Sequence, residues 1–273
     1  MTSPIATHTC VPILRSRAPR SSQGRIKIPH LAVIVFTIAF GIHGLPYTAK
    51  AGPPLIADDP NTIGKGTLLP IIATGVVHRA DRTLLSGPIL DLTAGAVESL
   101  DLTLVASLES QYRSATDPPW QLGGLFLPGV KWRFVSVDGA RAAFSPAMGV
   151  STTAPERPFF LLPVQAEFAV SDSAWVLGFD VGYVPVVRSP DRWFIAPYAA
   201  ASVTSSLVVL FELWSLGSGP TEAVDLGASI GVNARLGRTQ LRLLAALGTG
   251  FVSFGRDRVL ARAYLGVQYT FSP

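Results

Sequence analysis

The chain has 273 residues, a length that allows one large all-β domain, and its formal charge is +4. Six of its 22 basic residues and none of its 18 acidic residues lie in residues 1–51, which leaves 16 basic against 18 acidic residues and no electrostatic basis for nucleic-acid binding. Charged residues make up 15% of the chain, against about 25% in an average soluble domain, and beyond residue 51 the only lysines are Lys65 and Lys131. Since lysine is the usual residue of a water-exposed surface, this composition argues against an ordinary soluble barrel or sandwich.

Residues 1–51 have the features of a secretory signal peptide, which we expect to be cleaved between Ala51 and Gly52. Basic residues precede the apolar run LAVIVFTIAF at 31–40, and an Ala-x-Ala site ends at Ala51. An uncleaved anchor is the alternative, but the apolar run is shorter than the roughly 20 residues that a spanning helix needs. Cys10 precedes the apolar run, so the processed chain would contain no cysteine.

Residues 52–66 are predicted to form an extended periplasmic lead-in to the domain that follows. The segment reads GPPLIADDPNTIGKG, and its three prolines and three glycines exclude regular structure. The adjacent Asp58 and Asp59 could be read as a metal pair, but acids in such a segment are more often solvated or capping. We therefore expect no metal site and no cofactor.

Residues 67–273 are predicted to be an all-β domain, a transmembrane antiparallel up-and-down β-barrel of about 12 strands. The segment 224–236, VDLGASIGVNARL, alternates apolar and polar residues, and two more segments repeat the pattern before Phe271. Pro70, Pro146 and Pro163 fall inside proposed strands, as does Pro197, so bulges or a count of ten strands remain alternatives. The twelve segments lie at roughly 67–78, 87–96, 101–112, 126–136, 141–152, 160–171, 174–186, 192–203, 206–216, 223–236, 239–251 and 257–271.

The connections between these segments alternate in length, and this rhythm favours an outer-membrane barrel. Those after every second segment are tight, such as Asp172-Ser173, whereas the others are mostly longer or richer in Pro and Gly. Bacterial outer-membrane barrels have short periplasmic turns, long external loops and an even strand count. With twelve strands both termini would lie in the periplasm. Aromatic residues near the strand ends fit an interfacial girdle, although strand propensity also favours them.

In each segment the polar residues occupy alternate positions and are predicted to face the lumen. Thirteen charged side chains lie at these positions. One alternative is an internal lattice of ion pairs that fills the barrel, since buried charges need partners. The other is a narrow pore with opposed charges, because twelve strands lie between the filled eight-stranded and the open sixteen-stranded barrel. Trp120, in the external connection 113–125, is a candidate contact residue. The thirteen charges are Asp91, Asp101, Glu109, Lys131, Arg133, Arg141, Glu167, Asp180, Glu212, Asp225, Arg235, Arg242 and Arg262.

Three stretches resemble a bacterial outer-membrane family, the transporter or MetA-pathway-of-phenol-degradation family. They are GPPLIADDP at 52–60 with the following Gly-Lys-Gly at 64–66, LFLPGVKWRF at 125–134 and YLGVQYTF at 264–271. The resemblance implies a membrane barrel that acts as a transporter, often encoded beside genes of aromatic degradation, and it supplies no catalytic motif. The chain departs from the usual aromatic C-terminus of outer-membrane proteins, because Ser272 and Pro273 follow Phe271.

The sequence therefore favours a passive outer-membrane channel for small solutes, and the family resemblance implies that these solutes are hydrophobic or aromatic. A closed structural or surface-interaction barrel is the second hypothesis. A lipid-modifying enzyme is a remote third, because His78 is the only histidine after residue 51 and no G-x-S-x-G motif accompanies it. The expected partners are outer-membrane lipid, the barrel-assembly machinery and a small-molecule solute, whereas nucleic acid is not expected.

Overall fold

A computed structural model describes residues 56–113, 120–152, 157–170, 174–219, 224–253 and 259–272. The predicted signal peptide, its cleavage site and the alternative of an uncleaved anchor lie outside these residues. The described residues contain no helix that is long and apolar enough to span a membrane.

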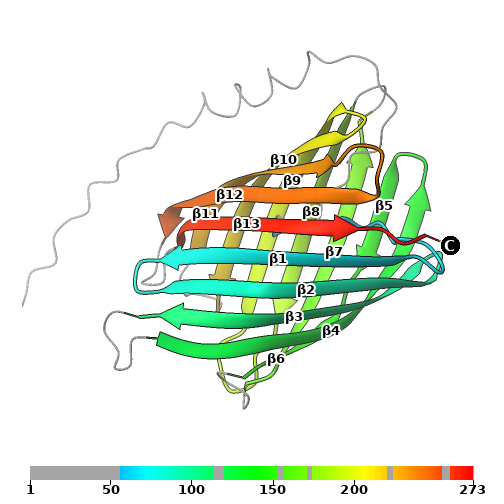
Figure 1. Cartoon of the computed structure of the whole chain (residues 1–273). Helices are drawn as coiled ribbons and strands as arrows, with labels where there is room; N and C mark the ends of the chain where they lie inside the picture. Colours follow the sequence, from blue (N-terminus) through cyan, green and yellow to red (C-terminus); the bar gives the residue numbers. More distant parts are fainter. Residues whose placement is uncertain are drawn as a thin grey trace, which may run out of the picture. The chain divides into compact units, whose positions relative to one another are not determined.

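The described part of the chain forms thirteen strands that run up and down around one barrel (Figure 1). Most strands have between ten and eighteen residues, longer than the roughly 5–6 residues of a typical globular strand. The strands are β1 (Leu68–Arg79), β2 (Thr83–Val97), β3 (Leu100–Tyr112), β4 (Trp120–Val137), β5 (Ala140–Phe144), β6 (Ala147–Ser151), β7 (Phe159–Ala169), β8 (Trp175–Val184), β9 (Arg192–Thr204), β10 (Leu207–Ser218), β11 (Val224–Arg235), β12 (Leu241–Ser253) and β13 (Val259–Tyr269).

The sheet closes on itself as a barrel of twelve antiparallel strands, which confirms the predicted count. Apart from β5 and β6, which do not pair with each other, each strand pairs with its neighbours in sequence, and β1 pairs with β13 from Ile71↔Gln268 onward. The strands β5 and β6 are two halves of one barrel strand, because both pair with β4 on one side and with β7 on the other. A closed barrel leaves no unpaired edge and so satisfies the backbone inside a bilayer.

The predicted prolines are accommodated in two ways. Pro146 lies at the break between β5 and β6, where Val130 N donates to the Pro146 carbonyl at 3.0 Å. Pro70, Pro163 and Pro197 keep their register positions opposite residues of a neighbouring strand. A local interruption therefore explains Pro146, whereas the other three sit within continuous strands.

The two ends of the barrel differ in their connections, as predicted. At one end, here called the turn end, the connections are 98–99, 138–139, 170–174, 205–206 and 236–240. At the other, the loop end, they are 80–82, 113–119, 152–158, 185–191, 219–223 and 254–258. Connection 80–82 is shorter than the predicted 79–86, because β2 begins at Thr83. The turn-end connections 170–174 and 236–240 are longer than the predicted 172–173 and 237–238, because the strands on either side of them are shorter than predicted. The C-terminus lies at the turn end (Figure 1).

The outward face of the barrel is apolar along its whole height. Leu102 and Leu108 of β3 are exposed, and so are the alternate residues Leu177, Phe179 and Val181 of β8. These side chains alternate along their strands with residues that the sequence predicted to face the lumen, such as Asp101 and Asp180. Such a continuous apolar belt is favourable in hydrocarbon and unfavourable in water, so the barrel is built to span a membrane.

Candidate functional site

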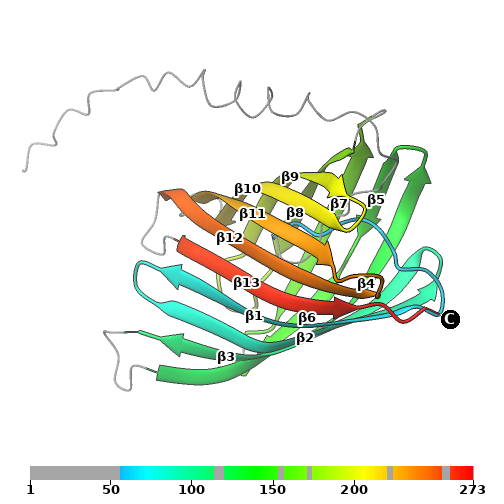
Figure 2. The same cartoon turned by 45° about the horizontal axis from the view of Figure 1, so that its top comes forward.

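Residues 56–66 form no helix or strand, and they run from the turn end of β1 into the lumen (Figure 2). Ala57 is fully buried, and its N–H donates to Glu212 Oε1 of β10 at 2.6 Å. Ile63 N lies 3.1 Å and 3.3 Å from the two carboxylate oxygens of Asp101 on β3. The segment therefore crosses the lumen between opposite walls. Instead of an extended lead-in outside the barrel, residues 56–63, here called the lumen segment, occupy its interior.

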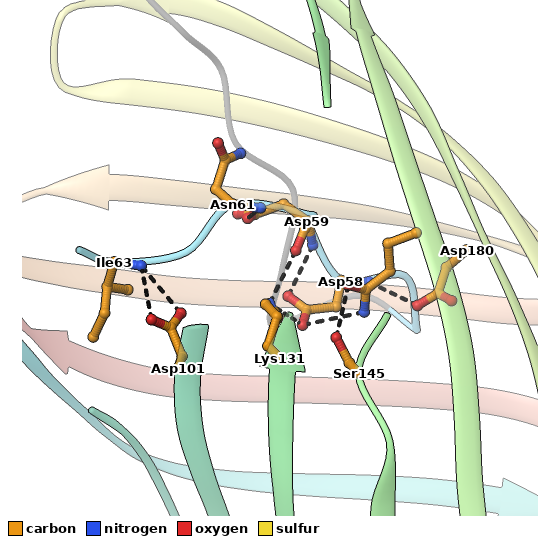
Figure 3. A network of polar contacts seen from close by, with 9 residues as sticks. Asp58, Asp59, Asn61, Ile63, Asp101, Lys131, Ser145 and Asp180 are labelled. Carbon is orange, nitrogen blue, oxygen red and sulfur yellow. Dashed lines mark hydrogen bonds and ion pairs between the residues drawn. The ribbon is translucent and has the colours of Figure 1, made fainter. Parts of the chain in front are cut away.

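Lys131 of β4 connects the barrel wall to the lumen segment (Figure 3). Its Nζ lies 2.5 Å from Asp58 Oδ2 and donates to the Asp59 carbonyl at 2.9 Å. On the opposite side Asp58 N donates to Asp180 Oδ2 of β8 at 3.3 Å. Asp59 Oδ1 accepts the N–H of Asn61 at 2.8 Å, so it caps a turn. The two adjacent acids thus hold the segment in place, one through an ion pair and one through a cap.

One further contact holds the lumen segment, and another holds the residues that connect it to β1. Asn61 Nδ2 donates to Glu167 Oε1 of β7 at 2.8 Å, and the same oxygen accepts from Arg141 Nη1 at 2.9 Å. At the turn end Gly66 N donates to the Gly95 carbonyl at 2.9 Å. A Cβ added to Gly95 would lie 1.7 Å from the Gly64 carbonyl oxygen, so only glycine lets the two backbones approach this closely.

The other predicted lumen charges lie on the inward face and have varied partners. Arg262 Nη1 is 3.9 Å from Glu212 Oε2, and Asp225 is 3.6 Å from Arg79, an inward residue that the sequence did not single out. Arg133 Nη2 donates to the Glu98 carbonyl at 2.9 Å. The half-buried Glu109 shares the parity of Asp101 on β3, and Asp91, Arg235 and Arg242 line a cavity described below.

These contacts alter the predicted choice between an ion-pair lattice and a pore. Only Arg141–Glu167 and Arg262–Glu212 are ion pairs between two of the predicted charges in the described residues. Asp101 and Asp180 accept backbone N–H groups of the lumen segment instead. The charges therefore hold a peptide within the lumen rather than simply neutralising one another.

Part of the lumen wall is apolar, which the alternating pattern did not predict. Trp214 is 2% exposed, and it packs with Tyr198, Leu210 and Val176 against Ala57. Its Nε1 donates to Ser229 Oγ at 3.1 Å. The charged and polar residues identified the alternate positions of these strands that face inward. Large aromatic residues also occupy some of these inward positions. The apolar part of the wall could have been predicted from Trp214, which lies two positions after the inward Glu212 and therefore on the same face of the strand.

A cavity of about 680 Å³ lies between the lumen segment and the barrel wall. Its lining includes Ile71 and Val105 on one side and Arg235 and Arg242 on another. Turn-end residues, among them Ser205, Ser206 and Ser272, belong to the same lining, so the cavity extends to that end of the barrel. Its volume falls within the range of about 300–1,000 Å³ typical of small-molecule sites.

Two other predicted residues lie at the loop end. Trp120 is the first residue of β4 rather than a loop residue, and its ring centroid is 5.0 Å from that of Tyr112. Half of Trp120 is exposed, which fits an aromatic residue at a membrane interface. His78 Nδ1 is 2.9 Å from Thr83 Oγ1 across the first hairpin.

Solved structures with the same fold are outer-membrane barrels. The COG4313 outer membrane channel from Pseudomonas putida F1 has a TM-score of 0.64 at 11% identity, over 81% of this chain and 100% of that one. The NanC porin has a TM-score of 0.52 at 9% identity, over 73% and 98%, and the KdgM porin 0.50 at 10% identity, over 74% and 99%. Neither a scan of protein-family models nor a search of curated proteins found a match. The chain therefore has an outer-membrane barrel fold.

Proposed function

We propose that this protein is a passive outer-membrane channel for small solutes, and that the lumen segment closes its lumen in the state described. The observation that carries the proposal is the combination of a cavity of about 680 Å³ with a lumen segment fixed by hydrogen bonds and ion pairs. A barrel with a purely structural role needs no unfilled volume, because side chains alone can fill a narrow interior.

The way in which the lumen segment is held supports a closure that can open. Its contacts with Glu212, Asp180 and Asp101 are hydrogen bonds from backbone N–H groups, and none of residues 56–63 belongs to a strand. Water can replace such contacts at a net free-energy cost of about 0.5–3 kcal/mol each. The segment can therefore leave without disturbing the strand pairing of the barrel.

Several finer assignments belong to the same proposal. We place the turn end and both chain termini in the periplasm, because short turns occupy that side in bacterial barrels. We also propose that the chain belongs to the phenol-degradation transporter family, which residues 52–60 resemble. Its solutes would be small hydrophobic or aromatic molecules. Its partners would be outer-membrane lipid and the barrel-assembly machinery.

Liposome swelling tests the proposal with two forms of the chain, one starting at Gly52 and one starting at Gly64. We expect the shorter form to admit arabinose faster than the longer form, because it lacks the lumen segment. The larger sugar raffinose serves as a size control and should enter more slowly through either form. If neither form admits arabinose faster than protein-free vesicles, the barrel is not a channel.

A closed structural barrel remains the competing function, and the well-held lumen segment favours it. Lys131, Asp101 and Glu212 all contribute to that hold, and each is at most 8% exposed. The same experiment separates the two candidates. A structural barrel without the segment would lose stability, seen as a lower temperature for the heat-induced change in gel mobility, but would gain no solute flux.

A further inference from the structure

The cavity in the turn-end half of the lumen has an unusual arrangement of charge on its wall. Arg235 of β11 and Arg242 of β12 lie directly opposite each other in the strand register, and both line the cavity. Like charges at directly opposite positions of an antiparallel pair destabilise the sheet. Such a pair therefore calls for a compensating anion.

No compensating carboxylate approaches this pair from the described part of the chain. The side-chain hydrogen bond there is from Arg242 Nη1 to Asn233 Oδ1 at 3.0 Å, and Asn233 is neutral. Arg235 is exposed and Arg242 is half-buried. Two guanidinium groups thus face the same cavity and can together bind one carboxylate.

A row of residues across the barrel wall leads away from the two arginines and includes both polar and aliphatic side chains. The hydrogen-bond register connects Arg242 to Gln268, Gln268 to Ile71, and Ile71 to Asp91. The row continues from Asp91 to Val105 and from Val105 to Leu127. Each of these residues lines the cavity, and Leu69 and Leu161 add to the apolar surface. Ile71 lies two strands from Arg242, which corresponds to roughly 10 Å, so a small ligand held by its head at the arginines would lay its body on Ile71 and Leu69.

Asp91 sets a limit on the charge of such a ligand. It lies three strands from Arg242, which corresponds to roughly 14 Å at the usual strand spacing. A second carboxylate pointing toward Asp91 would meet a like charge inside the barrel. The wall therefore favours one negative group at the arginine end and an uncharged body.

We propose that this cavity binds a small amphipathic monocarboxylate, held at its carboxylate by Arg235 and Arg242 and along its aliphatic or aromatic body by Leu69 and Ile71. The assignment deepens the proposed channel function, since it names the class of solute that would pause in the lumen. It rests on that function only for the claim that the bound molecule is later released across the membrane.

Isothermal titration calorimetry in detergent micelles tests the site with four probes: hexanoate, 1-hexanol, adipate and inorganic phosphate. Empty micelles correct for partitioning. We expect hexanoate to bind at least about tenfold more tightly than hexanol, which lacks the charge that the arginines recognise. Adipate should bind more weakly than hexanoate because of Asp91, and phosphate should bind more weakly because it has no apolar body.

The variant Arg235→Gln with Arg242→Gln should reduce hexanoate binding to the level of hexanol. Arg238→Gln is the matched control, because Arg238 is an exposed arginine in the neighbouring turn and does not line the cavity. Retention of heat-modifiable gel mobility shows that each variant is folded, and an Arg235→Lys, Arg242→Lys form that keeps both charges should retain most of the binding.

Equal binding of hexanoate and hexanol, or hexanoate binding that survives the double glutamine variant, would overturn the site. Tighter binding of adipate than of hexanoate would overturn the preference for a monocarboxylate. Failure of the site is distinguishable from failure of the channel: binding without liposome swelling would remove the channel and leave the site, and swelling without selective binding would do the reverse.

Discussion

The Lys131 ammonium, 2.5 Å from the carboxylate of Asp58, joins the wall of the barrel to the lumen segment. Lys131 is 8% exposed, although lysine is the residue most typical of water-exposed surfaces. Its buried charge is stabilised by Asp58 and the Asp59 carbonyl, so the position of the lumen segment depends on it.

Replacing Lys131 with Met should loosen the lumen segment without opening the barrel. Loss of a hydrogen bond to a charged group reduces stability by about 1.5–3 kcal/mol, so the backbone amides of Ala57, Asp58 and Ile63 should exchange hydrogen roughly tenfold to a hundredfold faster. Hydrogen-exchange mass spectrometry measures this change. Lys65→Met is the matched control, because Lys65 is exposed, and unchanged exchange in Lys131→Met would contradict the assigned role.

Gly95→Ala should displace the residues that connect the lumen segment to β1. The added methyl group would lie 1.7 Å from the Gly64 carbonyl oxygen, so the backbone at residues 64–66 must move. Trypsin should then cleave the folded protein after Lys65 several times faster than in the unchanged protein. Gly75→Ala provides the comparison, because its Cβ would lie at an ordinary 3.5 Å from the Ala263 carbonyl oxygen; equal cleavage of the two variants would argue against the close backbone contact.

Leu247→Arg should destabilise the barrel because of its depth in the membrane. Leu247 is 66% exposed at the centre of β12, on the apolar outward face. An arginine at the bilayer midplane costs about 2–4 kcal/mol, whereas one near the interface costs about 0–1 kcal/mol. Leu236→Arg, beyond the end of β11, is therefore the shallow control. Urea titrations of folding into lipid vesicles measure both, and similar losses would be inconsistent with the assigned membrane depth.

The barrel itself could be predicted from the sequence, because alternation of side chains is a local property of each strand. The run 224–236 carries its two faces in its own order of residues, and β11 is found at Val224–Arg235. The break at Pro146 was also visible as a proline within a strand. The alternating lengths of the connections predicted a closed topology with an even number of strands.

The contents of the lumen could not be predicted, because they depend on contacts between residues far apart in the chain. Ala57 meets Glu212 across 155 positions, and nothing near Ala57 identifies that partner. The absence of strand or helix signals in 52–66 correctly predicted an irregular segment, but the prediction of a periplasmic lead-in was wrong for residues 56–63, which lie inside the barrel. The inward charges were identified by parity, whereas their partners depended on which irregular segment entered the barrel.

Chemical accessibility of one cysteine tests most directly whether the lumen segment occupies the interior. The chain starting at Gly52 contains no cysteine, since Cys10 precedes it, so Ala57→Cys and Ser205→Cys each supply a single thiol. Ala57 is fully buried and Ser205 is exposed at the turn end. In folded protein, a bulky charged maleimide should label Ser205→Cys rapidly and Ala57→Cys at least about a hundredfold more slowly, and in urea-unfolded protein both at similar rates. Rapid labelling of Ala57→Cys in the folded barrel would contradict the account.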